Sequence, residues 1–317
     1  MGYSAGDTIL DDEYNTFVGS STDPFGYNHF AGPGSGVYGL NQSTISTVSA
    51  GDTIAASNWN TLFTGLDNIS NHTNVSITSS SVSAGDTIAI RSALVGDLAN
   101  LAAAVAGGST GATALGTNAV GSSTNSGTWN STSTIERSVT FANNNTMRAF
   151  FNAGGKIRVD PSVVTGIDGD KDTVFNDLTT TAIGNLDIAA AASTRSGSGE
   201  TLTTNGLARG FHDLTDSYQT IIKLTSDNSG YTGNTLEIFA KLNAAVATAT
   251  VITVKMVSTD GADDTTFSSN NLSSVPTNPN EAPRMTMALI EVHPTDAQGL
   301  AAAIQSASNA EVSNSAS

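Results

Sequence analysis

A five-residue phrase, AGDTI, occurs three times in the first third of the chain, beginning at Ala5, Ala50 and Ala84. After the first two copies the likeness continues into YNTFV at residues 14–18 and WNTLF at residues 59–63. The copies begin 45 and 34 residues apart, which is too unequal for a regular solenoid but fits a repeated packing unit. The sequence therefore predicts an N-terminal arm, residues 1–106, that is built from three turn–helix units.

Each copy has the composition of a tight turn that leads into a helix. The glycine permits a sharp turn, and the Asp and Thr after it can hydrogen-bond free backbone N–H groups. Asp7, Asp52 and Asp86 each stand alone beside Gly and Thr, whereas a metal site needs several ligands. Turn and cap roles are therefore favoured over metal binding at these three positions.

The segments after the turns have one apolar face at helical spacing. Leu66 and Ile69 continue the face that WNTLF begins, and the third unit repeats the pattern with Leu101 and Val105. One short helix cannot bury such a face alone, so the helices are expected to pack on one another or on those of a neighbouring subunit. The predicted packing and assembly residues are Tyr14, Phe17, Trp59, Leu62, Phe63, Leu94 and Leu98.

The rest of the chain predicts an α+β domain with a largely antiparallel sheet. Residues 107–130 are rich in Gly, Ser and Thr and have no charge, which is typical of a linker or an extended crossing segment. Residues 131–292 contain a strand–helix–Gly-Gly–strand unit and then alternating apolar segments typical of antiparallel strands. Residues 293–317 are an Ala-rich tail, expected to be a weak helix or unordered. The expected strands after the first unit lie near 186–188, 218–224, 236–242, 251–257 and 285–292.

Composition narrows the classes of function. With 12 Lys and Arg and a net charge of −16, the chain lacks the basic surface that nucleic-acid binding needs. It has no cysteine, so packing or oligomerisation must stabilise it, and thiol chemistry is excluded. The sequence also shows no export signal and no membrane-spanning run. The low share of charged residues and the many small polar residues resemble the composition of virion surface proteins. With no export signal, this composition predicts a virion protein that is assembled in a host cytoplasm and released by lysis.

Four motifs together resemble a known group of proteins. They are AGDTI with WNTL, FFNAGGKIR at residues 150–158, LTDSYQTI at 214–221 and YTGNTLEIFA at 231–240. In this combination the chain resembles virion structural proteins of contractile-tailed phages of marine cyanobacteria and related bacteria. The resemblance implies membership of the particle, where proteins of this kind occur in tail, baseplate, fibre and head surface. Together with the unburied helix faces and the lack of cysteine, it predicts a fibre-like or tail-associated homo-oligomer whose partners are itself and other virion proteins. Leu10, Ala55 and Ala89 stand where a capping hydroxyl or amide is expected, so the repeat helices should depend on packing.

One acidic loop is a candidate metal site. Asp168, Asp170 and Asp172 alternate along the chain and could surround Ca²⁺, the one cofactor that the sequence suggests. However, Thr179 occupies the position where an EF-hand needs its bidentate Glu, and Lys171 lies inside the loop. The alternative is a solvated loop that caps the following helix.

Other chemistry has little support, so the sequence predicts a non-enzymatic protein. The four histidines form no ligand pair, and no serine stands in a GxSxG motif. Gly34–Gly39 matches GxGxxG, but it follows Pro33 rather than a strand, which argues against a dinucleotide site. The alternatives left open are a receptor- or carbohydrate-binding module that uses loops such as 226–233, and a capsid decoration protein.

Overall fold

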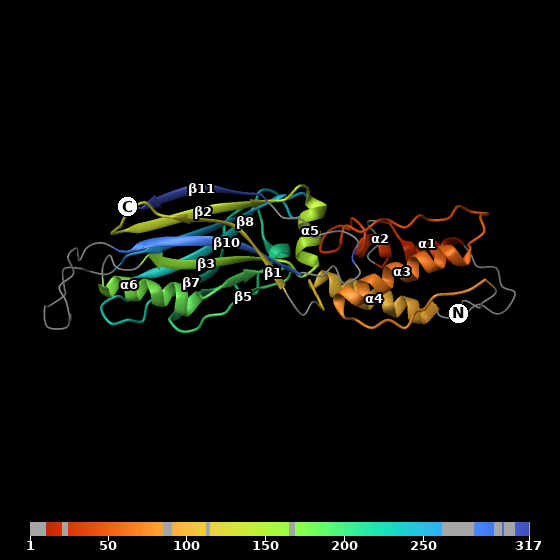
Figure 1. The fold of residues 1–317 in the computed structure, drawn as a ribbon, viewed down its shortest axis with the longest axis horizontal. Helices are drawn as coiled ribbons and strands as arrows, with labels where there is room; N and C mark the ends of the chain where they lie inside the picture. Colours follow the sequence, from red (N-terminus) through yellow and green to blue (C-terminus); the bar gives the residue numbers. More distant parts are fainter. Residues whose placement is uncertain are drawn as a thin grey trace. The chain divides into compact units, whose positions relative to one another are not determined.

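The computed structural model describes residues 11–20, 25–84, 91–111, 115–164, 169–261, 282–294, 300 and 308–316 (Figure 1). The chain divides into two compact units. Unit 1 comprises residues 1–116, 143–155 and 293–305, and unit 2 comprises residues 117–142, 156–292 and 306–317. Helices dominate the first unit and antiparallel strands the second, which confirms the predicted α+β class.

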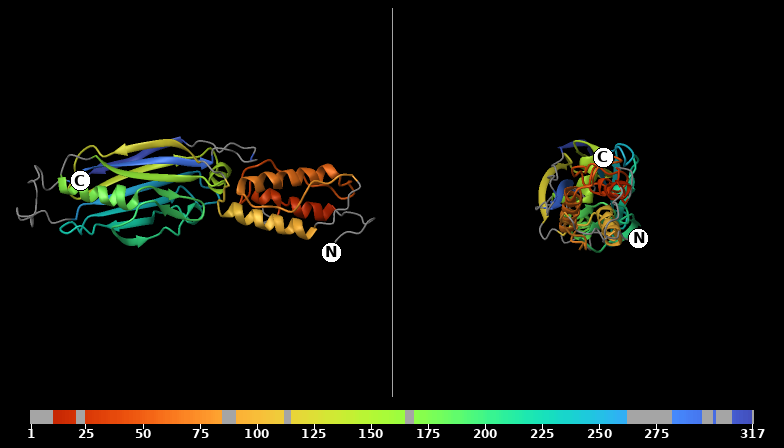
Figure 2. Two further views of the ribbon diagram at one scale, coloured as in Figure 1. Left: turned by 60° about the horizontal axis from the view of Figure 1, so that its bottom comes forward. Right: turned by 90° about the vertical axis from the view of Figure 1, so that its right-hand side faces the viewer.

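Unit 1 is a helical bundle in which the repeat helices pack on one another. Helices α1, α3 and α4 run lengthwise beside one another (Figure 1, Figure 2). Of the two outcomes expected from the sequence, packing within the chain is therefore present. The helices of the unit are α1 (Asp11–Val18), α2 (Tyr27–Phe30), α3 (Ala56–Thr73), α4 (Arg91–Ala106) and α5 (Asn144–Asn152).

Aromatic rings of the first two repeats form the centre of this core. Trp59 is 2% exposed, and the Tyr14 ring meets it edge-on at a centroid distance of 5.2 Å. Phe17 lies 6.0 Å from Trp59 on another side, and Phe63 stacks on it at 6.0 Å. Because aromatic side chains bury large areas, these contacts join the first and second repeats into one core.

Helix α5 belongs to unit 1, although its flanking strands belong to unit 2. Asn143 caps the helix by accepting a hydrogen bond from the Thr146 N–H at 2.9 Å. Arg148 donates to the Pro33 carbonyl at 2.8 Å, and Asn152 donates to the Gly39 carbonyl at 3.0 Å. The compact units therefore divide the chain differently from the expected range 131–292, because side-chain hydrogen bonds fix this helix on residues 33–39.

Unit 2 contains two sheets. The first has the strand order β1-β10-β3-β4-β5 and the second the order β11-β2-β9-β8-β7-β6. The strands of the first sheet are β1 (Leu115–Thr124), β3 (Lys156–Val164), β4 (Leu186–Ile188), β5 (Ser193–Arg195) and β10 (Arg284–Pro294). Those of the second are β2 (Thr132–Thr140), β6 (Thr201–Asn205), β7 (Gln219–Thr225), β8 (Thr235–Leu242), β9 (Val251–Thr259) and β11 (Ser308–Ala316).

Alternation along the strands builds the core of unit 2. On β8 the side chains of Leu236, Ile238, Ala240 and Leu242 are fully buried, while those between them are half-buried. Helix α6 (Gly169–Asn176) continues into the π-helix η1 (Asp177–Ile183), and a 3-10 turn, η2 (Phe211–Asp213), precedes β7. Because η1 contacts β3 of one sheet and β7 and β8 of the other, it helps to join the two sheets.

Two segments expected to lack regular structure contain strands. The predicted linker includes β1, of which only Val120 and Ser123 are buried, and the predicted tail includes β11. Leu300, also in the predicted tail, is part of the core of unit 1. The extended conformation of β1 agrees with the alternative of an extended crossing segment, whereas the prediction for the tail was wrong. An edge strand is held mainly by backbone hydrogen bonds, which leave little trace in the side-chain pattern.

Candidate functional site: a polar groove in unit 1

The repeats are held together by asparagine side chains that imitate a strand partner. The Asn15 amide donates to the Val48 carbonyl at 2.8 Å and accepts from the Val48 N–H at 2.9 Å. The Asn60 amide makes the same two bonds with Val82, at 2.9 Å and 2.8 Å. Asn15 and Asn60 are the equivalent asparagines of YNTF and WNTL, and each valine begins the next copy of VSAGDTI. Each repeat helix therefore fixes the extended segment that leads into the next turn.

Two further side chains fix the same extended segments. Asn28 bonds in both directions with the backbone of Ile45, at 2.9 Å and 2.8 Å. The buried Asp97 carboxylate accepts from the Thr78 N–H at 3.0 Å and from the Ser79 N–H at 2.8 Å. Such bonds satisfy backbone groups of a segment that lies outside any sheet.

The turn of the second repeat behaves as its sequence predicted. Asp52 accepts a hydrogen bond from the Ser49 N–H at 3.1 Å, and Gly51 has a φ of +92°, which favours glycine. The helix start is served by a different side chain, because Asn58 accepts from the Ala55 N–H at 3.0 Å. The equivalent residues Asp7 and Asp86 lie outside the described residues.

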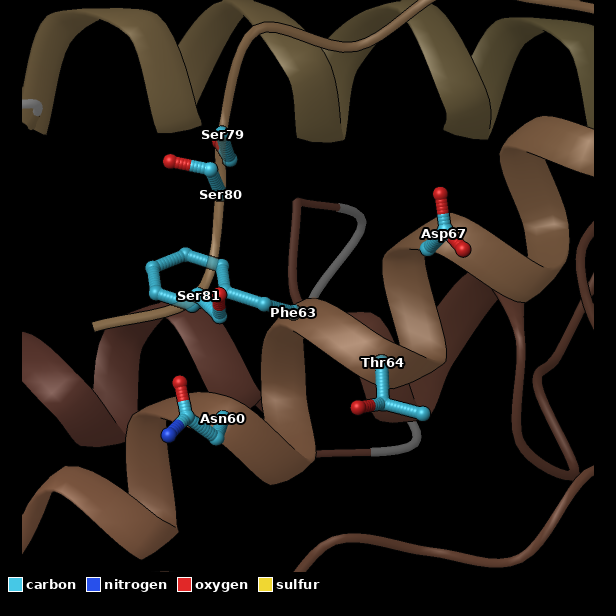
Figure 3. A pocket seen from close by; sticks show the side chains of 7 residues that line it. All are labelled: Asn60, Phe63, Thr64, Asp67, Ser79, Ser80 and Ser81. Carbon is cyan, nitrogen blue, oxygen red and sulfur yellow. The ribbon is translucent and has the colours of Figure 1, made fainter. Parts of the chain in front are cut away.

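We call the paired hydrogen bonds from an asparagine side chain to one backbone residue a clamp. The extended segment 78–82, which the Asn60 clamp holds, and helix α3 line a groove of about 320 Å³ (Figure 3). Asn60, Phe63, Thr64 and Asp67 line it from α3, and residues 79–81, all serines, line it from the extended segment. The groove exists because the Asn60 clamp and Asp97 hold that segment beside the helix.

The groove combines an aromatic ring with hydroxyl, amide and carboxylate groups. Phe63 is half-buried and points toward the extended segment, while the side chains of Thr64, Asp67, Ser80 and Ser81 are exposed. The Ser79 hydroxyl donates to Asp97 at 2.5 Å, and Asp67 accepts from Asn71 at 3.3 Å. An apolar ring surrounded by donors and acceptors suits a small polar ligand that presents both an apolar face and hydroxyls.

The seven predicted packing residues lie together. Tyr14, Phe17, Trp59, Leu62, Leu94 and Leu98 are buried in the core of unit 1, and Phe63 packs against it half-buried. The groove and the asparagine clamps were not predicted. The signal for the clamps was present, because an asparagine recurs at the same place after the first two AGDTI copies.

Two of the three candidate calcium residues are described by the structure, and both lie on a helix. Asp168 lies outside the described residues, while Asp170 and Asp172 lie in the first turn of α6. Residues two apart on a helix point to nearly opposite sides, about 200° apart, so these two carboxylates diverge. Lys171 is buried and its Nζ lies 2.7 Å from Oδ2 of Asp260. Across the described ranges, no group of three or more His, Asp or Glu residues could hold a metal ion.

A second pair of aromatic rings lies in unit 2, within two of the motifs that resemble phage virion proteins. Tyr218 comes from LTDSYQTI and Phe239 from YTGNTLEIFA. Lys255 lies 4.0 Å from the Tyr218 ring centroid and 4.6 Å from that of Phe239, while Lys241 lies 4.3 Å from Tyr218. Burial of the hydroxyl, with the nearby Glu136 carboxylate, raises the pKa of Tyr218. These rings are therefore covered by lysines, unlike Phe63 in the groove.

Comparisons with known proteins add no relative: no family model matches the chain, and no curated protein or solved structure is significantly similar. Within the part of the chain that the structure describes, no helix has the length and apolar character to cross a membrane.

Replacing Asn60 by Ala is expected to lower the free energy of unfolding of unit 1 by about 1–3 kcal/mol. The substitution removes both bonds to Val82 and leaves two half-buried backbone groups unsatisfied. Asn71→Ala on the same helix is the matched control, since Asn71 is exposed and bonds only weakly to Asp67. Urea unfolding followed by circular dichroism at the helical band measures both. Equal stability of the two variants would contradict the clamp.

Proposed function

We propose that this protein is a non-enzymatic structural component of a phage particle, and that it acts by assembling with itself and with other particle proteins. The four motifs that resemble phage virion proteins support the first part of this proposal, that the chain belongs to a phage particle. The observation that carries the assembly is the edge of the six-stranded sheet at β11, which pairs with no other described strand on its outer side. Residues 310–316 of that strand are all exposed.

An open strand edge is an assembly surface because it presents unpaired N–H and C=O groups. Natural edges are commonly protected by lysine or proline, whereas β11 has the sequence SNAEVSNSA, with one charge and neither of those residues. Val312 on this strand is 52% exposed. Such an edge favours pairing with another chain, and paired edges add the contacts that disulfides cannot supply here.

The mass of the purified full-length chain tests this assembly. Light scattering coupled to gel filtration, over a range of protein concentrations, is expected to give a mass of at least two chains of 32.2 kDa each. Raising the salt concentration should strengthen the association, since each copy has a net charge of −16 and like charges are screened by salt. A mass of one chain at every concentration and salt level would contradict the proposal.

A second candidate function is sugar binding in the groove. The groove places the Phe63 ring beside the serine hydroxyls and the Asp67 carboxylate. A sugar ring has an apolar face that packs on an aromatic ring and hydroxyls that bond to carboxylates and serines. The groove is a better place for this than loop 226–233, where Ser226 and Tyr231 are buried.

Phe63→Ala is expected to weaken binding of a sugar in the groove roughly two- to tenfold, because it removes the aromatic platform. NMR titration with a panel of neutral monosaccharides and host polysaccharide fragments measures the affinity. Tyr38→Ala is the control, since Tyr38 is a half-buried ring of unit 1 that packs on His29 outside the groove. Thermal unfolding must show both variants folded at the titration temperature. Failure of every sugar to bind the unaltered protein would reject this second function.

A further inference from the structure

We propose that β11 pairs with strand β2 of a second copy of this chain, so that neighbouring subunits exchange their C-terminal strands. This inference rests on the proposed self-assembly. It concerns the inner edge of β11, which pairs with β2, and leaves the outer edge of β11 open for the pairing proposed above. The partner is therefore another copy of the chain, and the contact is an antiparallel strand pair.

The first step is that β11 is held almost entirely by its backbone. It pairs with β2 from Ser308, opposite Thr140, to Ala316, opposite Ser133, with a register shift between Glu311 and Ser313. From residue 310 to residue 316 every side chain is exposed. Because so little apolar surface is buried, releasing the strand costs mainly its hydrogen bonds, and such segments open at low free energy.

Side chains add little to this attachment. Asn314 donates to the Thr124 carbonyl at 2.9 Å, and the Ser313 hydroxyl lies 3.4 Å from a Glu136 carboxylate oxygen. Both contacts are exposed. An identical strand from another copy restores all of these bonds, so exchange between copies changes the bonding very little.

The second step is that β2 remains in place when β11 leaves. Ile135 and Val139 of β2 are fully buried, and the strand pairs with β9 along its whole length. Removing β11 therefore leaves a rigid, open edge with a row of unpaired backbone groups. The chain segment with the matching sequence and register is β11 itself.

The third step is that the strand has a tether. Leu300 is 6% exposed in the core of unit 1, and eight residue steps separate it from Ser308 at the start of β11. A chain of that length spans at most about 28 Å. Because Leu300 is held by the core of unit 1, release of β11 from its sheet does not itself remove this residue from that core. Reciprocal exchange closes a dimer, whereas head-to-tail exchange builds an open filament.

Single cysteines test the exchange cleanly because the chain has no cysteine of its own. Thr134 and Ser315 face each other in the β2–β11 pair. A Thr134→Cys variant and a Ser315→Cys variant with a size tag are mixed, unfolded and refolded together, and then oxidised mildly. Strand exchange should yield covalent dimers that contain one chain of each kind, seen on a non-reducing gel.

Thr140→Cys mixed with the same tagged Ser315→Cys variant is the matched control. Thr140 lies opposite Ser308, so its distance from Ser315 is about 20 Å and exceeds the reach of a disulfide. At least fivefold more mixed dimer from the Thr134 pair than from the Thr140 pair supports exchange. Equal yields would overturn it, as would a Thr134→Cys/Ser315→Cys double variant that forms only bonds within one chain.

Deletion of residues 308–317 gives an independent reading. Exchange predicts that the shortened chain loses the oligomer of defined mass that the full chain forms, because no C-terminal strand remains to pair with the bared β2 edge. Its thermal unfolding should change little because the removed side chains are exposed from residue 310 on. If the full chain associates but its strands pair within one copy, strand exchange is wrong and the proposed function stands. If the full chain is a single copy under all conditions, both are wrong.

Discussion

Replacing Lys171 by Met is expected to lower the free energy of unfolding of unit 2 by about 3–5 kcal/mol. The Lys171 ammonium lies 2.7 Å from the Asp260 carboxylate, and the two side chains are 2% and 1% exposed. Removing the cation leaves a buried carboxylate without its counter-charge, which is far more costly than losing an exposed pair. Trp129 fluorescence reports this transition, because Trp129 packs 5.1 Å from Phe175 of the same helix, α6.

Two further variants test whether the loss of stability arises from the burial of the Lys171–Asp260 ion pair. Lys223→Met breaks an ion pair with Glu237 in which the lysine side chain is 36% exposed, so it should cost less than about 1 kcal/mol. Lys171→Met combined with Asp260→Leu should recover most of the lost stability, because the buried Asp260 carboxylate is then removed together with its partner cation. If Lys171→Met costs no more than Lys223→Met, the buried pair does not stabilise the unit as described.

Trp59→Ala is expected to lower the free energy of unfolding of unit 1 by about 3–5 kcal/mol. The indole contacts the rings of Tyr14, Phe17 and Phe63, so its removal opens a cavity between the first two repeats. Helical circular dichroism reports the loss, while fluorescence of Trp129 shows whether unit 2 is unaffected. Phe63→Ala should cost clearly less because that ring is only half-buried.

A failure to assemble after mutation of the unit 1 core does not by itself identify an assembly contact, because the same mutation can unfold the unit. A Trp59→Ser/Phe63→Ser variant is expected not to assemble, but since Trp59 is buried within one chain, unfolding of unit 1 alone would produce that result. Deletion of residues 308–317 avoids this ambiguity, since it leaves the core of unit 1 intact. Loss of Trp59 without any fall in helical stability would contradict the packing of the repeats.

Side-chain periodicity explains which parts of the fold were predictable. The apolar face of α3 and the alternation of β8 both have side chains that repeat with the period of the element, so their type was predicted correctly. Strands β1 and β11 have no such pattern, because backbone bonds at a sheet edge hold them. Helix α5 was predicted as an element, but its place in unit 1 depends on bonds from Arg148 and Asn152 to residues distant in sequence.

The candidate site was less predictable than the core around it. Trp59 and Phe63 were expected to pack, but the groove depends on a segment held by Asn60 and Asp97, and polar side chains have no periodicity that reveals such bonds. The sequence contains one clue: the dipeptide Asn-Thr follows Tyr14 in the first repeat and Trp59 in the second. A repeated polar residue at a fixed place in a repeat is therefore worth testing as a backbone clamp.

The presence of this chain in purified particles tests the central claim most directly. The gene product is tagged, particles are purified, and peptide mass spectrometry and low-resolution imaging measure its stoichiometry and position. The account predicts a fixed number of copies per particle, at a repeated position marked by the tag. Absence of the chain from particles that are otherwise complete would contradict it.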